Sequence, residues 1–417
     1  MKTKYILLVV ALFFGISVSA QKIVFRTDIF SPNIKTLQLI VNDDRMLPPV
    51  INLSGGDYFE INFDELSVGR TRYAYAIIHC NADWTKSDLI PVEYMTGLQN
   101  QLINDYDTSF NTTMNYTHYK LFFPNEDIQF LVSGNYVVLV SEEGREDNPV
   151  LAACFSVVDQ QVKTQMSVTT NTMVDFNQSH QQLSFTVNYA SNMFPALQNF
   201  KIYALQNNRR DNMVLASSPS SMLPGKIVFE HNRNLIFEAG NEYRRFEIVS
   251  TRYKGMNVHS VQFFSPYFHQ TLFPDELRSG RSYLFDRDQN GRFFIRSNDA
   301  SNYDIESDYV FVHFTLLCEK PFLEDIYLLG EAFHNIFDER SKMTYNYEKK
   351  YYEKAVLLKQ GLYNYLYVSQ KDNRASTGLV EGNYFQTENE YMILVYYRPP
   401  GGRYDQLVGM QNMKFIS

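Results

Sequence analysis

The sequence is poor in cysteine, in tryptophan and in positive charge. Its 417 residues contain three Cys and a single Trp, and the formal net charge is −8. Cys80, Cys154 and Cys318 are too few for a disulfide scaffold, and a bond between Cys80 and Cys154 stays open because spacing does not establish geometry. The negative charge argues against binding to nucleic acid, whose phosphates need a basic patch, and against binding to anionic lipid.

Long apolar runs are absent after the first twenty residues. Residues 1–20 carry Lys2 and Lys4, then an apolar run over residues 5–18 and a small-residue cleavage site before Gln21. This pattern is typical of a secretory signal peptide, so the mature chain is expected to begin at Gln21. No Cys follows the cleavage site and no later segment is long enough to cross a bilayer. These features predict an exported, soluble protein without a lipid anchor.

Motifs that carry catalysis are also missing. The sequence has no Gly-x-Ser-x-Gly elbow, no glycine loop for phosphate and no His/Cys pair at zinc spacing. His79 and Cys80 are adjacent, but neighbours on one strand point to opposite faces and cannot form the hydrogen bond that activates a thiol. The prediction is therefore a protein without enzyme activity and without a cofactor.

One segment imitates a metal loop. Residues 286–291 (DRDQNG) look like the start of a calcium-binding loop, but the twelfth position, which should supply a bidentate carboxylate, is Ser297. A simpler interpretation of the same residues is an Asn-Gly β-turn between two strands at residues 283–285 and 292–295. We therefore predict no metal site.

Aromatic and β-branched residues are abundant. The chain has 30 Tyr and 32 Phe, and hardly any stretch keeps a 3.6-residue apolar period. A weak echo of Gly followed by Tyr, at Gly134, Gly240 and Gly361, precedes three strand-like runs about one sandwich domain apart. The expected fold is all-β, with three tandem immunoglobulin-like or early-set β-sandwich domains after the signal peptide. The expected divisions are 1–20 for the signal peptide and 21–158, 159–303 and 304–417 for the three sandwiches.

The stretch over residues 73–140 organises the expected first domain. It opens with an alternating, β-rich run that ends at Trp84, and it closes with a Gly-x-Tyr step into residues 137–140 (VVLV). The first run predicts a central strand with Trp84 packed at its rim. At the close of the stretch, Tyr136 is expected to turn its hydroxyl back onto the corner backbone, as in a tyrosine corner.

Between these two strands lies an insertion that is far longer than a hairpin needs. Its mixture of aromatic side chains with Asn, Thr and Ser suits an adaptable contact with another protein, although a loop that covers its own sandwich explains the composition equally well. The hypothesis is a protein-binding site made by Tyr94, Tyr106, Phe110, Asn111, Tyr116 and Tyr119.

An ordered series of short motifs runs through nearly the whole mature chain. It comprises 79–84 (HCNADW), 104–106 (NDY), 116–119 (YTHY), 133–136 (SGNY), 240–244 (GNEYR), 288–291 (DQNG) and 387–391 (TENEY). By this series the sequence resembles the plug protein family of the type IX secretion system of Bacteroidota. The resemblance implies a periplasmic protein, associated with the outer membrane through its partner, that binds the periplasmic opening of the translocon barrel. It also implies that the protein seals this opening when no cargo is passing.

The third expected domain suggests an alternative. A strand into residues 330–333 (GEAF), followed by an aromatic strand and residues 358–361 (LKQG), looks like the early-set sandwich of glycogen-binding modules. Those modules stack sugar on exposed Trp, and this chain has none after Trp84. The alternative function is a glycan-binding or surface accessory protein of a polysaccharide-handling system, which a glycan array distinguishes from a plug.

Overall fold

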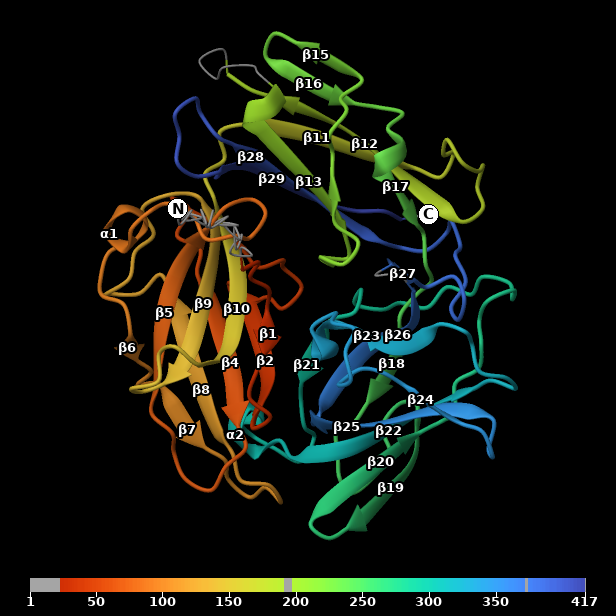
Figure 1. The fold of residues 1–417 in the computed structure, drawn as a ribbon. Helices are drawn as coiled ribbons and strands as arrows, with labels where there is room; N and C mark the ends of the chain where they lie inside the picture. The colour runs from red at the N-terminus through yellow and green to blue at the C-terminus, as the bar shows by residue number, and fades with distance from the viewer. Residues whose placement is uncertain (1–22, 191–196, 372–373, 417) are drawn as a thin grey trace, which may run out of the picture.

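The computed structural model describes residues 23–190, 197–371 and 374–416, and it is almost entirely β-structure, with 47% strand and 4% helix. The expected signal peptide lies outside the described residues. The all-β sandwich prediction is confirmed. Three sandwiches lie around one another in Figure 1: the first in red to yellow, the second mainly in green above it, and the third in green to blue below the second.

The first sandwich packs a sheet of order β1-β10-β9-β5-β6, with β3 beside β10, against a sheet of order β2-β4-β8-β7. Its core is rich in aromatic side chains from both sheets. The ring of Phe59 contacts those of Phe123 and Phe155, with ring centres 5.3 and 4.0 Å apart. Its elements are β1 (Asp28–Ile29), β2 (Ile34–Val41), β3 (Val50–Asn52), β4 (Phe59–Glu65), β5 (Tyr73–Cys80), α1 (Pro91–Tyr94), β6 (Gln101–Leu102), β7 (Tyr106–Thr108), β8 (Thr117–Phe123), β9 (Gly134–Glu142) and β10 (Pro149–Val158).

The predicted corner at Tyr136 is present. Its hydroxyl donates to the carbonyl oxygen of Val132 at 2.6 Å, four residues upstream. Gly134 enters β9 with φ +147°, and a Cβ there would lie 2.3 Å from Nε2 of the buried His79, so only glycine fits this position. Tyr363 in the third sandwich repeats the device, because its hydroxyl donates to the carbonyl of Lys359, also four residues upstream, at 2.5 Å.

The second sandwich is completed by the C-terminal hairpin. One sheet has the order β11-β12-β16-β15, with β17 beside β12, and the other has the order β14-β13-β28-β29. The blue strands β28 and β29 therefore lie beside green β13 in Figure 1. The elements are β11 (Lys163–Thr169), β12 (His180–Asn188), η1 (Leu197–Asn199), β13 (Phe200–Gln206), β14 (Val214–Leu215), β15 (Ser221–Leu223), β16 (Lys226–Phe229), η2 (Arg233–Leu235), β17 (Ile236–Glu238), β28 (Glu390–Tyr397) and β29 (Gln406–Lys414).

The third sandwich is formed by the chain between β17 and β28. One sheet centres on β26, which pairs with β18, β21, β23 and β27, and the other has the order β19-β20-β22-β25-β24. The elements are β18 (Arg244–Glu247), β19 (Val258–Phe264), β20 (Tyr267–Leu272), β21 (Phe293–Ile295), α2 (Tyr303–Glu306), β22 (Tyr309–Leu317), β23 (Asp325–Leu329), η3 (Glu331–Phe333), β24 (Thr344–Asn346), β25 (Tyr351–Lys359), β26 (Gly361–Lys371) and β27 (Arg374–Ser376).

This strand grouping differs from three consecutive sandwiches divided at residues 159 and 304. The strand β18, expected in the second sandwich, pairs with β26 of the third, and β28 and β29, expected in the third, pair within the second. The physical reason is that strand pairing depends on backbone hydrogen bonds between segments far apart in the chain, which a local sequence pattern does not encode. The third sandwich is thus inserted into the second.

Each sandwich contacts the other two. Tyr396 of β28 donates its hydroxyl to Asn135 of the first sandwich at 2.8 Å. Arg292, in the third sandwich, forms an ion pair at 2.7 Å with Glu390 of β28. The first and third sandwiches meet through Lys359 and Asp64, whose charged atoms are 2.6 Å apart. The three contacts close the molecule into a ring of sandwiches.

Candidate protein-binding surfaces and the interdomain cavity

Three of the six residues predicted to bind a partner are buried. Tyr94 ends α1 and donates its hydroxyl to the carbonyl of Ile77 at 2.7 Å. Tyr119 of β8 donates to the carbonyl of Thr71, also at 2.7 Å. Tyr116 is buried just before β8. A buried tyrosine hydroxyl needs a partner, and the protein itself supplies it, so these side chains hold the fold together and are not free for another protein.

The other three predicted residues lie closer to solvent. Tyr106 of β7 is half-buried beneath Arg70, whose guanidinium lies 3.6 Å from the ring centre. Phe110 is 69% exposed, and Asn111 beside it is exposed with φ +57°, a conformation that Asn tolerates well. The structure brings Tyr106 close to Tyr119 and places Phe110 and Asn111 at the tip of the insertion. Only this tip remains as a candidate contact with a partner.

The insertion also joins the first sandwich to the third. Tyr116 donates its hydroxyl to the carbonyl of Ser307 at 2.8 Å, and the backbone N–H of Phe110 donates to the carbonyl of Ile305 at the same distance. Thr113 donates from its backbone and its hydroxyl to the carboxylate of Asp308. The long insertion is therefore largely accounted for as a covering and joining segment within the protein.

A buried charged cluster lies at the same joint. Asp64 of β4 accepts hydrogen bonds at 2.6 Å from Lys359, from the hydroxyl of Tyr309 and from Nδ1 of His118. Asp64, His118, Lys359 and Tyr309 are all buried. Burial raises the pKa of Asp64, but Lys359 and His118 outweigh it and hold the pKa of that carboxyl below its usual range. The fully partnered carboxylate thus links two sandwiches that are far apart in the chain.

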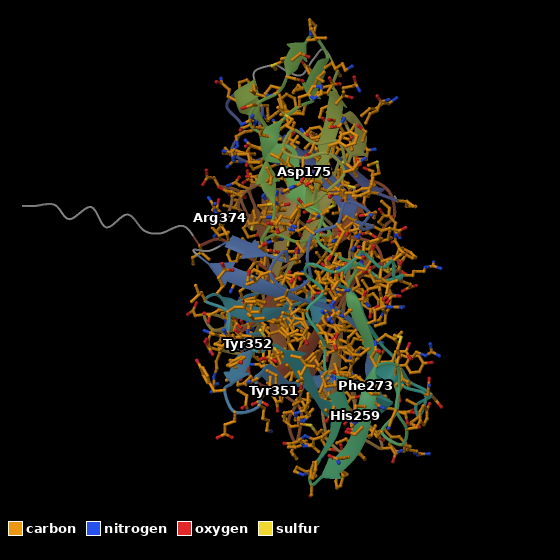
Figure 2. All side chains as sticks on the ribbon, turned by 90° about the vertical axis from the view of Figure 1, so that its right-hand side faces the viewer. Asp175, His259, Phe273, Tyr351, Tyr352 and Arg374 are labelled. Atoms are coloured by element: carbon orange, nitrogen blue, oxygen red, sulfur yellow. The ribbon has the colours of Figure 1, made fainter. Side chains whose placement is uncertain are left out.

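The third sandwich carries an exposed aromatic hairpin that was not predicted from the sequence. It consists of β19 and β20, and Phe263 and Phe264 at its tip are 54% and 57% exposed. Phe273 and His259 lie close together near its base (Figure 2). Their ring centres are 5.3 Å apart. β19 pairs only with β20 in the described part of the chain, so it is an edge strand. Residues 255–274 contain no Asp, Glu, Lys or Arg. This lack of charge was the sequence feature from which the hairpin could have been noticed.

The ring of sandwiches encloses a cavity of about 560 Å³. The first sandwich contributes Trp84, which is buried against Cys80 and Cys154 as the sequence predicted for a rim tryptophan. The second contributes Arg210, whose guanidinium stacks 3.4 Å from the centre of the Trp84 ring. The third contributes Glu331 from the η3 turn. Trp84 is therefore both a packing residue and part of the cavity wall.

The remaining chemical candidates have structural roles. His79 hydrogen-bonds to Ser87 and to the carbonyl of Ser133 and packs against Tyr136, whereas Cys80 lies in the separate cluster with Trp84, so the two do not interact as base and thiol. Burial raises the pKa of the Cys80 thiol, which keeps it protonated. In the described residues all three cysteines are free.

The turn at residues 286–291 behaves as predicted only in part. Asn290 and Gly291 have the positive φ values of a tight turn, and Asp288 accepts the backbone N–H of Asn290. The turn leads into β21, but residues 283–285 form no strand, because β21 pairs with β26 instead. Among the described residues no group of three or more acidic, His or Cys side chains is arranged to hold a metal ion.

The fold defines a multidomain β-sandwich protein with exposed aromatic side chains on its first and third sandwiches. A family model described as "Type 9 secretion system plug protein 1st domain" matches residues 34–159, which is the first sandwich. The first sandwich of this chain therefore belongs to the type IX secretion plug family, which is a secretion family and not an enzyme family.

The solved structures add a full-length relative. The crystal structure of a hypothetical protein from Parabacteroides merdae ATCC 43184 is 49% identical, covers 94% of this chain and 100% of that chain, and superposes with a TM-score of 0.92. The alkylpurine DNA glycosylase AlkC of Pseudomonas fluorescens reaches a TM-score of only 0.17 at 13% identity over 30% of each chain, which supports no common fold. No curated protein matches the sequence. In the described residues no helix is long and apolar enough to span a membrane.

Proposed function

We propose that this protein is a periplasmic plug that binds the periplasmic opening of the type IX outer-membrane translocon barrel and seals it while no cargo is passing. The observation that carries the proposal is the match of the first sandwich to the plug family. A wide, water-filled barrel leaks unless a body of matching size covers it. Three sandwiches that brace one another in a ring are better suited to this steric role than a flexible loop, since each holds the other two in place.

Two exposed surfaces are candidates for the contact with the barrel. The first is the insertion tip, which consists of Phe110 and Asn111. These are the two residues of the six-residue hypothesis that are exposed. The second is the hairpin tip, Phe263 with Phe264. Uncharged aromatic surfaces suit the centre of a protein interface because desolvating charges there is costly. A simultaneous change of Tyr106, Phe110 and Tyr116 would not test this contact cleanly, because the loss of buried Tyr116 also breaks its hydrogen bond to the third sandwich.

The test is co-purification of the plug with the translocon, together with leakage of small molecules into the cell. Phe110→Ser and the double change Phe263→Ser with Phe264→Ser are compared with Phe176→Ser, an exposed phenylalanine of the second sandwich. We expect at least one of the first two variants to lose co-purification and to cause leakage while Phe176→Ser does neither. If the wild-type protein does not co-purify with the barrel, the proposed function is wrong. A glycan array on the same protein checks the alternative function.

A further inference from the structure

The interdomain cavity has the dimensions and the walls of a ligand site. Its volume of about 560 Å³ lies within the range of small-molecule pockets, which is about 300 to 1,000 Å³. Buried Trp84, Leu394 and Tyr396 form much of its apolar floor. Arg26 and Leu47 are exposed residues of its lining and mark its opening, since their side chains reach solvent. The cavity lies between three domains, is accessible from outside and presents polar and apolar surface in about equal measure.

Two guanidinium groups in this wall form no ion pair in the described part of the chain, although the negative charges of Asp304 and Glu60 act on one of them, Arg45. Arg45 lines the cavity, and its Nη1 atom is buried without a hydrogen-bond partner among the described residues. Arg210 stacks on Trp84 and donates to the carbonyl of Phe25 at 3.1 Å, and it forms no ion pair in the described part of the chain. A buried guanidinium nitrogen without a partner is costly, because desolvation is not compensated. An anion in the cavity provides the missing compensation.

The acidic groups of the lining do not neutralise these cations. Asp211 already accepts hydrogen bonds from two nitrogens of Arg209, Nη2 and Nε, at 2.5 and 3.0 Å. Burial raises the pKa of Glu331 to about 7, which weakens its negative charge near neutral pH. Burial lowers the pKa of His334 to about 4, which leaves that imidazole neutral. The uncompensated charge of the wall is therefore positive.

We propose that this cavity binds an amphipathic organic anion, in which an aromatic or aliphatic body lies against Trp84 and a single carboxylate, sulfonate or phosphate group contacts Arg45 and Arg210. The body of the ligand buries apolar area between the sandwiches, and the acidic group satisfies the free Nη1 of Arg45. The site is separate from the two candidate contacts with the barrel. Since its walls come from all three sandwiches, an occupant stabilises their mutual arrangement.

The test uses two dyes that differ by one acidic group: 8-anilinonaphthalene-1-sulfonate and its uncharged analogue N-phenyl-1-naphthylamine. Trp84 is the single tryptophan of the chain and lies in the cavity wall, so its fluorescence reports occupancy. We expect one saturable site per mature chain, quenching of Trp84, and at least tenfold tighter binding of the sulfonate than of the neutral dye. Arg45→Gln is expected to abolish this preference while leaving the melting temperature nearly unchanged, because the buried Nη1 atom of Arg45 has no hydrogen bond to lose.

Two control variants keep the outcome decisive. Arg252→Gln removes an exposed guanidinium on the third sandwich and is expected to leave the sulfonate preference intact. Phe263→Ser with Phe264→Ser removes the exposed hairpin aromatics and is also expected to have no effect on binding. Equal affinity for the two dyes, loss of dye binding in the hairpin variant, or an unchanged preference in Arg45→Gln overturns the proposal. None of these results depends on whether the protein plugs a barrel.

Discussion

The insertion of the first sandwich and the β19–β20 hairpin of the third are both rich in aromatic residues, yet their aromatic side chains have opposite environments. In the insertion Tyr94, Tyr116 and Tyr119 are buried, and each hydroxyl donates to a carbonyl of the protein. In the hairpin Phe263 and Phe264 are exposed. Tyrosine can bridge an apolar core and a polar joint because it carries one hydroxyl, whereas phenylalanine contributes only apolar area. Aromatic content alone therefore does not distinguish an internal joint from a binding surface.

The largest expected effect is in the insertion. Tyr119→Ala removes a fully buried ring from the aromatic core and leaves the carbonyl of Thr71 without its donor. We expect the free energy of unfolding to fall by about 5 kcal/mol, the upper end for truncating a large aromatic side chain. Urea unfolding measures this loss. A loss below about 1 kcal/mol contradicts the internal role of the insertion.

The next effect concerns the joint that the insertion covers. Lys359→Met leaves the buried Asp64 carboxylate without its cation and is expected to cost about 3 kcal/mol. The double variant Asp64→Leu with Lys359→Met removes both charges and is expected to recover most of this loss. Thermal melts of the single and double variants measure the coupling. Equal destabilisation in both variants means that the unpaired Asp64 carboxylate is not the cause of the loss.

The same cluster predicts a pH dependence. The folded-state pKa of Asp64 is lowered from its ordinary value of 3.8, so its contribution to stability is fully present above about pH 4. That contribution is lost as the pH falls from about 4 through the lowered pKa. Stability measured from pH 6 to pH 2 is therefore expected to fall more steeply for the natural protein than for the Asp64→Leu and Lys359→Met double variant. Parallel curves contradict this assignment.

The smallest effect on stability is expected at the hairpin tip. Phe263→Ser with Phe264→Ser is expected to change the free energy of unfolding by less than about 0.5 kcal/mol per substitution, because exposed side chains lose little when they are replaced. Chemical unfolding alongside Tyr119→Ala measures the difference directly. A loss as large as that of Tyr119→Ala means that the hairpin aromatics pack within the protein and removes the contrast between the two segments.

The sequence was sufficient to predict the all-β class, the strand at β5 and the corner at Tyr136, because these depend on local alternation and on one short turn. It did not predict the joint at Asp64, whose three partners come from distant strands. It misassigned Tyr116 for the same reason, since the carbonyl that binds its hydroxyl belongs to Ser307 in another sandwich. The exposed hairpin was detectable from its lack of charge, but an uncharged run predicts a buried strand equally well.

The pairing of β28 with β13 affects the order in which this protein can fold. The second sandwich obtains two of its strands from residues 390–414, so its sheet is complete only when this last part of the chain is available. The first sandwich contains all its strands by Val158 and can fold much earlier. A chain that ends before Glu390 therefore lacks half of one sheet in the second sandwich, while the strands of the first and third remain. Truncation from the C-terminus therefore disrupts the second sandwich before the third, although the third follows most of the second in the chain.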